Sequence, residues 1–178
     1  LGVDGQPLAE ATQQWVHVSL GQDVDAITPA RGSAELMAAF PALDTDEPMV
    51  KLPSTAMPIE GKHHVWCFDV WHTWMDPFAH VNHPVYVDWC DESTSRCLIA
   101  VGLDPQQLVP VADQVRFKRG LVGGNRVSVS TQIVGLTSDY SVVLRHRIET
   151  ESGEVAADAT TVRRMRTPAQ PDWLAVFA

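Results

Sequence analysis

The last third of the chain alternates hydrophobic and polar residues with a period of two. From residue 114 onward, four such runs follow one another, separated by the turn-forming stretches LVGGN, LTSD and ESGE. One face of the two middle runs comprises Val127, Val129, Thr131 and Ile133, then Tyr140, Val142, Leu144, His146 and Ile148. A period of two is typical of strands that bury one face. The pattern therefore predicts an antiparallel meander of three or four strands.

A long helix is expected before these strands. Pro84 opens a stretch that has no internal Gly or Pro before Gly102, which is the usual punctuation of a helix, with Asn82 or His83 as N-cap. Its small and apolar stripe comprises Val85, Trp89, Ser93, Cys97 and Ala100. Residues 63–74, rich in aromatic and β-branched side chains, predict a strand. This order of elements indicates an α+β domain in which an antiparallel sheet wraps one central helix.

The first 60 residues are predicted to form a separate segment. Residues 12–20 favour a strand, Ser33 is the expected N-cap of a short helix, and residues 42–61 are expected to form a surface connection. Residues 5–12 also resemble residues 153–160, with the same Gly, Ala, Ala and Thr. Coincidence in alanine-rich sequence is the alternative. If the repeat is real, residues 1–60 are the tail of a preceding copy. The main domain then spans residues 61–171, and residues 172–178 form a C-terminal tail.

Composition and charge exclude several classes of protein. The chain has 178 residues, 45% of them hydrophobic and 20% charged, as in ordinary globular proteins. It has a net charge of −9 and no apolar run of about 18 residues. We therefore expect a soluble, cytoplasmic protein that binds neither nucleic acid nor membrane. Residues 115–178 alone carry a net charge of +3, which suits an anionic ligand. The cysteines Cys67, Cys90 and Cys97 lack metal-ligand spacing, so we expect core thiols and no metal site.

The candidate chemistry lies just before the helix. Asp76, His80 and His83 fall within eight residues, with Asn82 among them and Tyr86 on the first helical turn. Backbone N–H groups at a helix start can polarise a carbonyl, while a carboxylate or an imidazole acts as base or nucleophile. The arrangement suits acyl chemistry. Each residue also has a structural interpretation, as a turn residue, a cap or a core side chain.

The segment around these residues resembles a known family. DPFAHVNHPVY, residues 76–86, is similar to the D-x-x-x-H-V-N-x-x-x-Y signature of hot-dog-fold thioesterases of the 4-hydroxybenzoyl-CoA thioesterase type. The resemblance covers roughly residues 63–166. It implies a curved antiparallel sheet around a central helix and two hot dogs that assemble with the active site between them. It also implies that Asp76 is the nucleophile or general base, and some members use a histidine at the His83 position.

A narrower resemblance is to the acyl-ACP thioesterases, which carry two hot dogs in one chain. The residues that match their second hot dog are Asp76, His80, Tyr86, Trp89, Glu92 and Ser93. Two positions depart from that family, because Phe78 replaces an asparagine and Gly120 replaces a glutamate. A mechanism led by Asp76 is therefore expected. Glu92 is either a buried partner of the site or a solvated helix acid.

A basic segment follows the helix and ends in a Gly-rich turn. Its candidate substrate-binding residues are Arg116, Lys118, Arg119, Gly123, Gly124 and Arg126. These residues suit the phosphates of coenzyme A or the acidic face of acyl carrier protein. A solvated edge strand protected by charge is the alternative.

The hypothesis from sequence is an acyl thioester hydrolase of fatty acid metabolism that cleaves acyl-CoA or acyl-ACP. Water is activated by Asp76 or attacks an Asp76-acyl anhydride, N–H groups near Pro84 to Tyr86 hold the carbonyl, and His83 or His80 assists. No cofactor is expected beyond the coenzyme A or phosphopantetheine of the substrate. We expect a homo-oligomer, dimer or tetramer, or pairing with a second hot-dog module. A non-catalytic acyl-CoA-binding hot dog and a hydroxyacyl-thioester dehydratase are the alternatives.

Overall fold

The structure is a computed structural model that describes residues 18–20, 27–29, 32–39 and 51–166. The contacts within it divide the chain into two compact units, with the division between Lys51 and Leu52. Each unit is described by itself. Among the described residues, no helix has the length and apolar character needed to cross a membrane.

The first unit contains a small hairpin and a short helix. Strand β1 (Val18–Leu20) pairs antiparallel with β2 (Ile27–Pro29), a strand that was not expected from sequence. Helix α1 (Ala34–Ala39) begins after Ser33, whose Oγ accepts a hydrogen bond from the backbone N–H of Leu36 at 3.1 Å. The predicted N-cap is therefore confirmed. Residues 5–12 of the internal repeat and residues 12–17 of the predicted strand lie outside the described residues.

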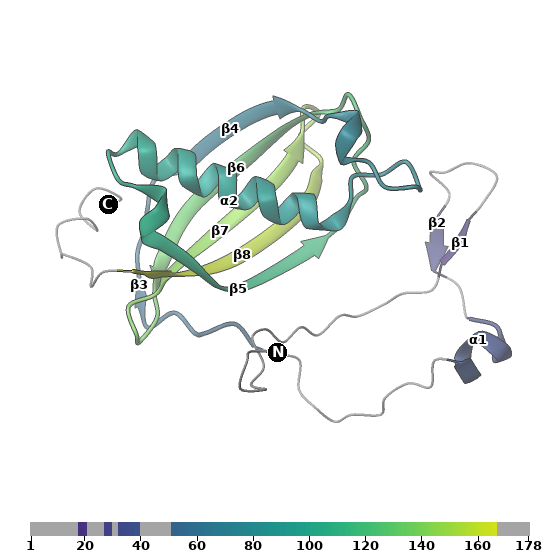
Figure 1. Cartoon of the computed structure of the whole chain (residues 1–178), viewed down its shortest axis with the longest axis horizontal. Coiled ribbons are helices and arrows are strands. Elements are labelled where there is room, and N and C mark those ends of the chain that lie inside the picture. The colour runs from purple at the N-terminus through teal and green to yellow at the C-terminus, as the bar shows by residue number, and fades with distance from the viewer. Residues whose placement is uncertain (1–17, 21–26, 30–31, 40–50, 167–178) are drawn as a thin grey trace, which may run out of the picture. The chain divides into compact units, whose positions relative to one another are not determined.

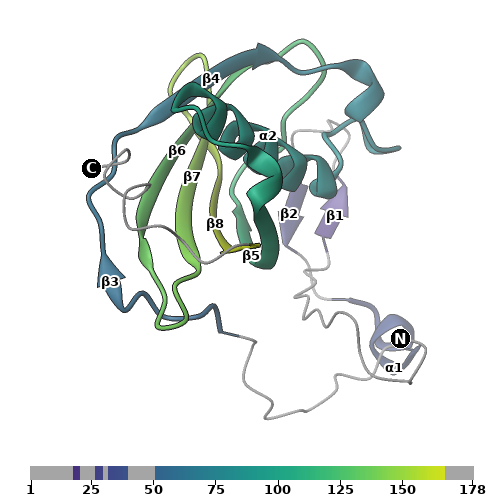
Figure 2. The ribbon, with the colours of Figure 1, turned by 60° about the vertical axis from the view of Figure 1, so that its left-hand side comes forward.

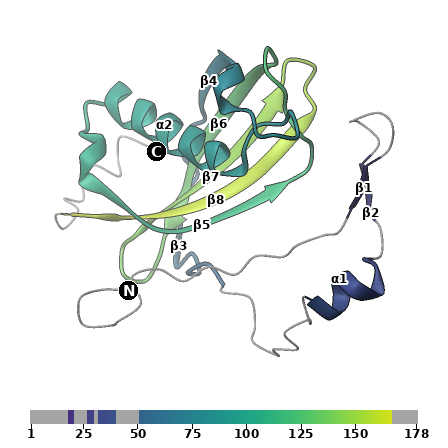
Figure 3. The same ribbon diagram turned by 45° about the vertical axis from the view of Figure 1, so that its right-hand side comes forward.

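The second unit combines one sheet with one long helix. Its strands are β3 (Met57–Pro58), β4 (His64–Asp69), β5 (Leu108–Phe117), β6 (Arg126–Leu136), β7 (Val142–Thr150) and β8 (Val155–Met165). Its helices are α2 (His83–Ala100) and the short 3₁₀ helices η1 (His72–Trp74) and η2 (Pro105–Gln107). The six-stranded sheet is antiparallel in the order β3-β6-β7-β8-β5, and β4 also pairs with β6. Figure 1 shows α2 lying across one face of this sheet, and the turned views in Figure 2 and Figure 3 show the strands curving around it. The predicted α+β architecture is confirmed.

The predicted antiparallel meander has three strands, β6, β7 and β8, and β5 pairs with β8 at its edge. Two other expectations about the strands are corrected. The strand expected over residues 63–74 ends at Asp69, which pairs with Arg126, the first residue of β6, and residues 72–74 form the 3₁₀ helix η1 instead. Part of the expected surface connection forms β3, which pairs with the other end of β6.

The alternating faces of β6 and β7 form the core, as predicted. Val127, Val129, Thr131 and Ile133 are buried, and so are Val142, Leu144, His146 and Ile148. Tyr140 differs, because it lies in the turn before β7 with φ of 62° and its side chain is 63% exposed. Cys67 is also exposed, on the solvent face of β4, and is not a core thiol.

The buried face of α2 is rotated relative to the predicted stripe. Its buried residues are Tyr86, Trp89, Cys90, Ser93, Thr94 and Leu98. Val85 and Cys97 are only half-buried, and Ala100 is exposed. Steps of four residues overshoot a helical turn of 3.6 residues by about 40°, so a stripe drawn mainly in such steps winds off the buried face.

A buried chain of side-chain hydrogen bonds joins the middle of α2 to three strands. Ser93 Oγ lies 2.8 Å from Thr131 Oγ1, which lies 2.8 Å from His146 Nδ1, and His146 Nε2 lies 2.9 Å from Thr161 Oγ1. Burial lowers the pKa of His146 to about 3, and the charge of Arg163 acts in the same direction. The imidazole is therefore neutral, and both of its nitrogens are used to hold the helix and the sheet together.

Candidate active site

Asp76 lies in a tight loop between η1 and α2. Met75 and Val81 form an isolated antiparallel bridge at the base of this loop, and the backbone N–H of Asp76 donates to His80 O at 2.7 Å. Asp76 Oδ1 accepts the backbone N–H groups of Phe78, at 2.8 Å, and His80, at 3.2 Å. Within the described residues, Oδ2 has no hydrogen-bond partner. One carboxylate oxygen therefore shapes the turn while the other stays available for chemistry.

The Asp76 loop is fastened to the Gly-rich turn that precedes β6. The backbone N–H of Val81 donates to Leu121 O, that of Gly124 donates to Val70 O, and that of Val70 donates to Asn125 O, each at 2.8 Å. Asn125 Oδ1 accepts the N–H of Val122 at 2.9 Å. The loop and the turn are far apart in sequence, and these bonds hold them as one unit.

Two histidine rings lie against glycines of this turn. A Cβ atom placed on Gly120 would lie 2.6 Å from His80 Cδ2, well inside van der Waals contact. A Cβ on Gly123 would overlap the His72 ring in the same way. His72 was not identified from the sequence as a site residue. Its ring contacts Gly123, which lies far along the chain, so no local sequence pattern indicated this contact. Gly120, where the resemblance expects a glutamate, has no room for any side chain while His80 keeps this position.

His83 and Tyr86, on the first turn of α2, both contact Phe117 at the end of β5. The His83 ring stacks on Phe117 with centroids 4.2 Å apart, and Tyr86 meets Phe117 edge-on at 5.2 Å. Tyr86 is 1% exposed, and burial raises its pKa to about 12, with the Asp76 charge acting in the same direction against the opposing effect of the Leu121 backbone. Tyr86 is therefore a neutral core side chain close enough to feel the Asp76 carboxylate. The sequence did not identify Phe117 as a site residue.

The first turn of α2 offers fewer backbone donors than expected. Asn82 is the N-cap, but its exposed side chain forms no capping hydrogen bond. Pro84 has no N–H, and the N–H of Val85 already donates to Asn82 O at 3.0 Å. Fewer of the N–H groups near Pro84 to Tyr86 are therefore available to hold a substrate carbonyl than the sequence suggested, and this role stays a prediction.

Most of the predicted cation cluster is already paired with acids. Lys118 pairs with Asp158, Arg119 with Glu154 at 2.5 Å, and Arg126 with Asp69 at 3.0 Å. Arg116 is exposed and forms no ion pair among the described residues. The turn itself has few free donors, because the N–H groups of Val122, Gly124 and Asn125 bond within the loop and turn.

Glu92 does not join the Asp76 loop. It pairs with Arg96 at 2.7 Å on the outer face of α2, where both side chains are about half exposed. Nine residues separate it from the helix start, which corresponds to about 14 Å along the axis. Of its two interpretations, the solvated helix acid is the one that these contacts favour.

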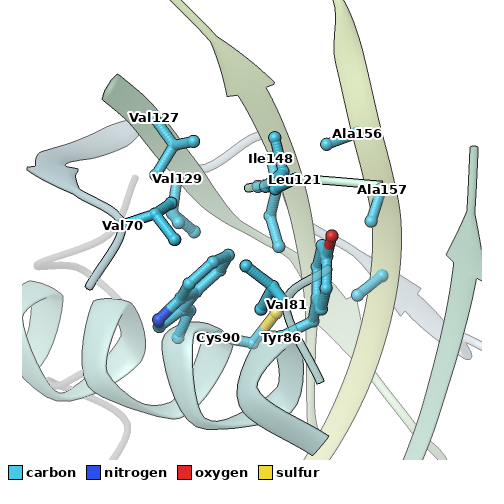
Figure 4. Close-up of a cluster of buried hydrophobic side chains, with 12 residues drawn as sticks. Val70, Val81, Tyr86, Cys90, Leu121, Val127, Val129, Ile148, Ala156 and Ala157 are labelled. Carbon is cyan, nitrogen blue, oxygen red and sulfur yellow. The ribbon is translucent and has the colours of Figure 1, made fainter. Parts of the chain in front are cut away.

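An aromatic cluster packs between β4, η1 and the start of α2. Trp89 meets Phe68, Trp74 and Tyr86 with ring centroids 5.0 to 5.3 Å apart. Its indole Nε1 is buried and finds no hydrogen-bond partner in the part of the chain that the structure describes. Figure 4 shows Tyr86 and Cys90 of the same helix directed toward Leu121, Ile148 and Ala157. Burial raises the pKa of the Cys90 thiol to about 12, which keeps it protonated and unreactive.

A cavity lies toward the other end of α2. Its volume is about 220 Å³, and its lining residues are Asp91, Thr94, Ser95, Leu98, Pro105, Leu108, Pro110 and Arg163. Arg163 is 2% exposed and pairs with Asp91 and Asp113 at 2.5 Å each. None of these residues belongs to the Asp76 loop, so this cavity is separate from the candidate active site.

Comparison with known proteins identifies the family. Residues 70–168 match the model of the thioesterase-like superfamily. The chain belongs to this superfamily. The match includes the Asp76 loop, α2 and the four strands that follow it, so the resemblance read from residues 76–86 is confirmed. No curated protein matches the chain.

Solved hot-dog thioesterases share the fold of this thioesterase-like chain. A gentisyl-coenzyme A thioesterase is 25% identical with a TM-score of 0.59, and the match covers 64% of this chain and 98% of the other. A 1,4-dihydroxy-2-naphthoyl-CoA thioesterase from Synechocystis is 19% identical with a TM-score of 0.59, covering 65% and 95%. A thioesterase from Thermus thermophilus, complexed with coenzyme A and Zn, is 24% identical with a TM-score of 0.54, covering 60% and 81%. These similarities confirm the predicted hot-dog fold.

Proposed function

We propose that this chain is an acyl thioester hydrolase in which Asp76 leads the reaction. The observation that carries the proposal is the Asp76 carboxylate, with one oxygen held by the turn and the other unbonded within the described residues. His80, whose backbone N–H donates to Asp76 Oδ1, and His83, the first residue of α2, are the imidazoles nearest to it along the chain. A fixed carboxylate assisted by an imidazole is a suitable arrangement for attack on a carbonyl. Family membership and the named activities of the related structures support the same reaction class.

Two versions of the reaction fit this arrangement. In the first, Asp76 takes a proton from water, the oxygen of that water attacks the thioester carbonyl, and the C–S bond breaks. In the second, Asp76 itself attacks the carbonyl, the C–S bond breaks to leave an anhydride, and water then cleaves the anhydride. In both, the leaving thiolate takes up a proton, which His83 or His80 supplies. No cofactor takes part beyond the coenzyme A or phosphopantetheine of the substrate.

Arg116 is the proposed contact for the phosphates of coenzyme A. It is the exposed cation of the basic segment without an acidic partner among the described residues, whereas Lys118, Arg119 and Arg126 are paired. In this proposal, the paired cations, with Gly123 and Gly124, border the path by which coenzyme A reaches the Asp76 loop. Three related structures carry coenzyme A, which supports this carrier over acyl carrier protein.

Asn82 and Tyr86 complete the proposed substrate contacts at the helix start. The exposed Asn82 amide can bond to the acyl or pantetheine portion, while the buried Tyr86 ring backs the site. Glu92 acts at most through Arg96, with which it pairs. A second hot-dog module, from another copy or from a tandem chain, is proposed to cover the exposed face of the Asp76 loop, where Phe78 is 63% exposed.

The test is hydrolysis of a panel of acyl-CoA and acyl-ACP substrates by the purified protein and by Asp76→Asn. The amide keeps the turn-forming oxygen but is neither base nor nucleophile, so we expect a loss of roughly 100- to 10,000-fold in kcat. Asp104→Asn is the matched control, because Asp104 Oδ1 accepts the N–H of Gln106 at 3.0 Å in the same kind of turn before η2. Wild-type turnover by Asp76→Asn would refute the proposal.

The same assays separate the remaining possibilities. Single turnover in ¹⁸O-labelled water distinguishes the two mechanisms, because label enters the Asp76 carboxylate only through the anhydride. Acyl-CoA binding without hydrolysis would identify a non-catalytic binding protein. Loss of water from a 3-hydroxyacyl-CoA would identify a dehydratase.

A further inference from the structure

We propose that Gly120 and Gly123 are positioning residues that seat the His80 and His72 rings beside the Asp76 loop, and that His72 is a further residue of the active site. This proposal rests on the proposed thioesterase function. His72 and His80 stand four residues before and four residues after Asp76. The Gly-rich turn therefore contacts one imidazole that precedes Asp76 in the chain and one that follows it.

The described glycines of the second unit fall into groups with different physical roles. Gly102, Gly124 and Gly153 have φ values of 77°, 86° and 82°, and a Cβ on any of them would meet no atom within 4 Å. Their backbone conformation favours glycine. Gly120 and Gly123 do not have this left-handed conformation, yet a Cβ on either would meet a histidine ring. Space for the rings, and not backbone conformation, therefore accounts for glycine at these two positions.

The turn is better suited to hold rings than to hold an anion. A phosphate-binding turn presents several free N–H groups to its ligand. Here the N–H groups of Gly124 and Asn125 donate to Val70 O and Val122 O, and that of Val122 donates to Asn125 Oδ1. At Gly120 and Gly123 the turn has no side chain, so a flat ring can pack directly against its backbone.

The seated histidines keep their nitrogens available. Among the described residues, no hydrogen bond engages the ring nitrogens of His72 or His80, although packing restricts both rings. A ring that is fixed but unbonded is ready to transfer a proton without first being oriented. In the proposed reaction, these two imidazoles assist His83 in giving a proton to the leaving thiolate, and that proton is later recovered from water.

A double-mutant experiment tests this proposal. The variants are Gly120→Ala and His80→Ala, alone and together, and Gly123→Ala with His72→Ala in the same design. Because the obstructing atoms belong to a side chain and not to the backbone, alanine should displace the ring and leave the fold intact. We expect each glycine variant to lower kcat by roughly 10- to 100-fold with KM nearly unchanged. In the matching His→Ala background, the same glycine change should cost less than about twofold.

Gly153→Ala is the control for a glycine change that strains the backbone but displaces no ring, since its φ is 82° and its added Cβ meets open space in the turn between β7 and β8. NMR supplies a readout that does not depend on activity: a nuclear Overhauser contact between the His80 ring and the Gly120 α-protons, which should vanish in Gly120→Ala as the ring signals shift. Unchanged His80 ring signals, or an equal loss of kcat with and without His80, would overturn the positioning role. If no thioester is hydrolysed, the proposed function fails, and the NMR measurement still decides whether the glycines seat the rings.

Discussion

The N-terminal end of α2 and its middle use polar side chains in opposite ways. In the middle, Ser93, Thr131, His146 and Thr161 are at most 1% exposed, and the two nitrogens of the one imidazole are both bonded. At the N-terminal end, the rings of His80 and His83 pack against Gly120 and Phe117, and their nitrogens form no hydrogen bond with any other described residue. A histidine whose nitrogens are consumed by the fold supports the structure, whereas one that is held by its ring keeps its acid–base chemistry.

The same contrast extends to charged groups. Arg163, at the middle of the helix, is buried between Asp91 and Asp113. Asp76, at the N-terminal end, has one carboxylate oxygen unbonded within the described residues, and Arg116 has no acidic partner there. Among the described residues, polar atoms without a hydrogen-bond or ion-pair partner therefore indicate candidate reactive groups better than residue type alone does.

Among the residues of this comparison other than Asp76, the largest effect is expected from His83. Replacing it with Ala should lower kcat/KM by roughly 100- to 1,000-fold, the usual contribution of a proton-transferring side chain. His83→Phe is the control for packing, because it keeps a ring against Phe117 but has no nitrogen. Steady-state kinetics of the two variants measure this effect. If His83→Phe retains activity, His83 acts by packing, and it does not differ from His146 in having an acid–base role.

His146→Ala should act on stability and not on chemistry. The change leaves the Thr131 and Thr161 hydroxyls buried without their partner and opens a cavity, so we expect the free energy of unfolding to fall by about 2 to 3 kcal/mol. Urea unfolding measures this change, and kcat at low temperature should stay within about twofold of wild type. A fully apolar replacement, Ser93→Ala with Thr131→Val, His146→Leu and Thr161→Val, should recover much of the lost stability, because no hydroxyl then lacks a partner.

The pH dependence of stability should also reveal His146. Its pKa falls from 6.5 in the unfolded chain to about 3 in the folded protein, so between these pH values only the unfolded state binds the proton. Stability is therefore fully present above pH 6.5 and decreases as the pH falls, by up to about 1.4 kcal/mol per pH unit from this residue. Urea titrations of wild type and His146→Leu at pH 7, 6 and 5 isolate the effect. Equal slopes in the two proteins would show that His146 is protonated in the fold.

The smallest effect is expected from Arg116. Arg116→Gln should raise KM for acyl-CoA by roughly 3- to 10-fold and leave kcat unchanged, as for an exposed cation that contacts phosphate. Lys118→Gln should change KM less, because Lys118 already pairs with Asp158. The difference should disappear with acyl-pantetheine substrates, which lack the nucleotide phosphates. An equal KM effect on both substrates would place Arg116 away from the phosphates.

Several features of the fold followed from local patterns in the sequence. The alternation at Val127, Val129 and Ile133 marked the buried face of β6, and Pro84 and Gly102 bounded α2. The signature over residues 76–86 led to the family, because the loop, the cap and the first helical turn are contiguous in the chain. Such features depend on neighbours within a few residues, which is the range over which sequence patterns act.

Partners distant in sequence were decided only by the tertiary structure. No local pattern indicated that β5 pairs with β8, that Phe117 stacks on His83, or that Gly120 lies under the His80 ring. These contacts join residues that are far apart along the chain, and each depends on how the sheet curves around α2. The sequence by itself thus determined the family and pointed to the Asp76 loop as the candidate site. Packing across the sheet decided which histidines are bonded into the core and which keep a free nitrogen, because an imidazole's chemistry is set by the groups around it.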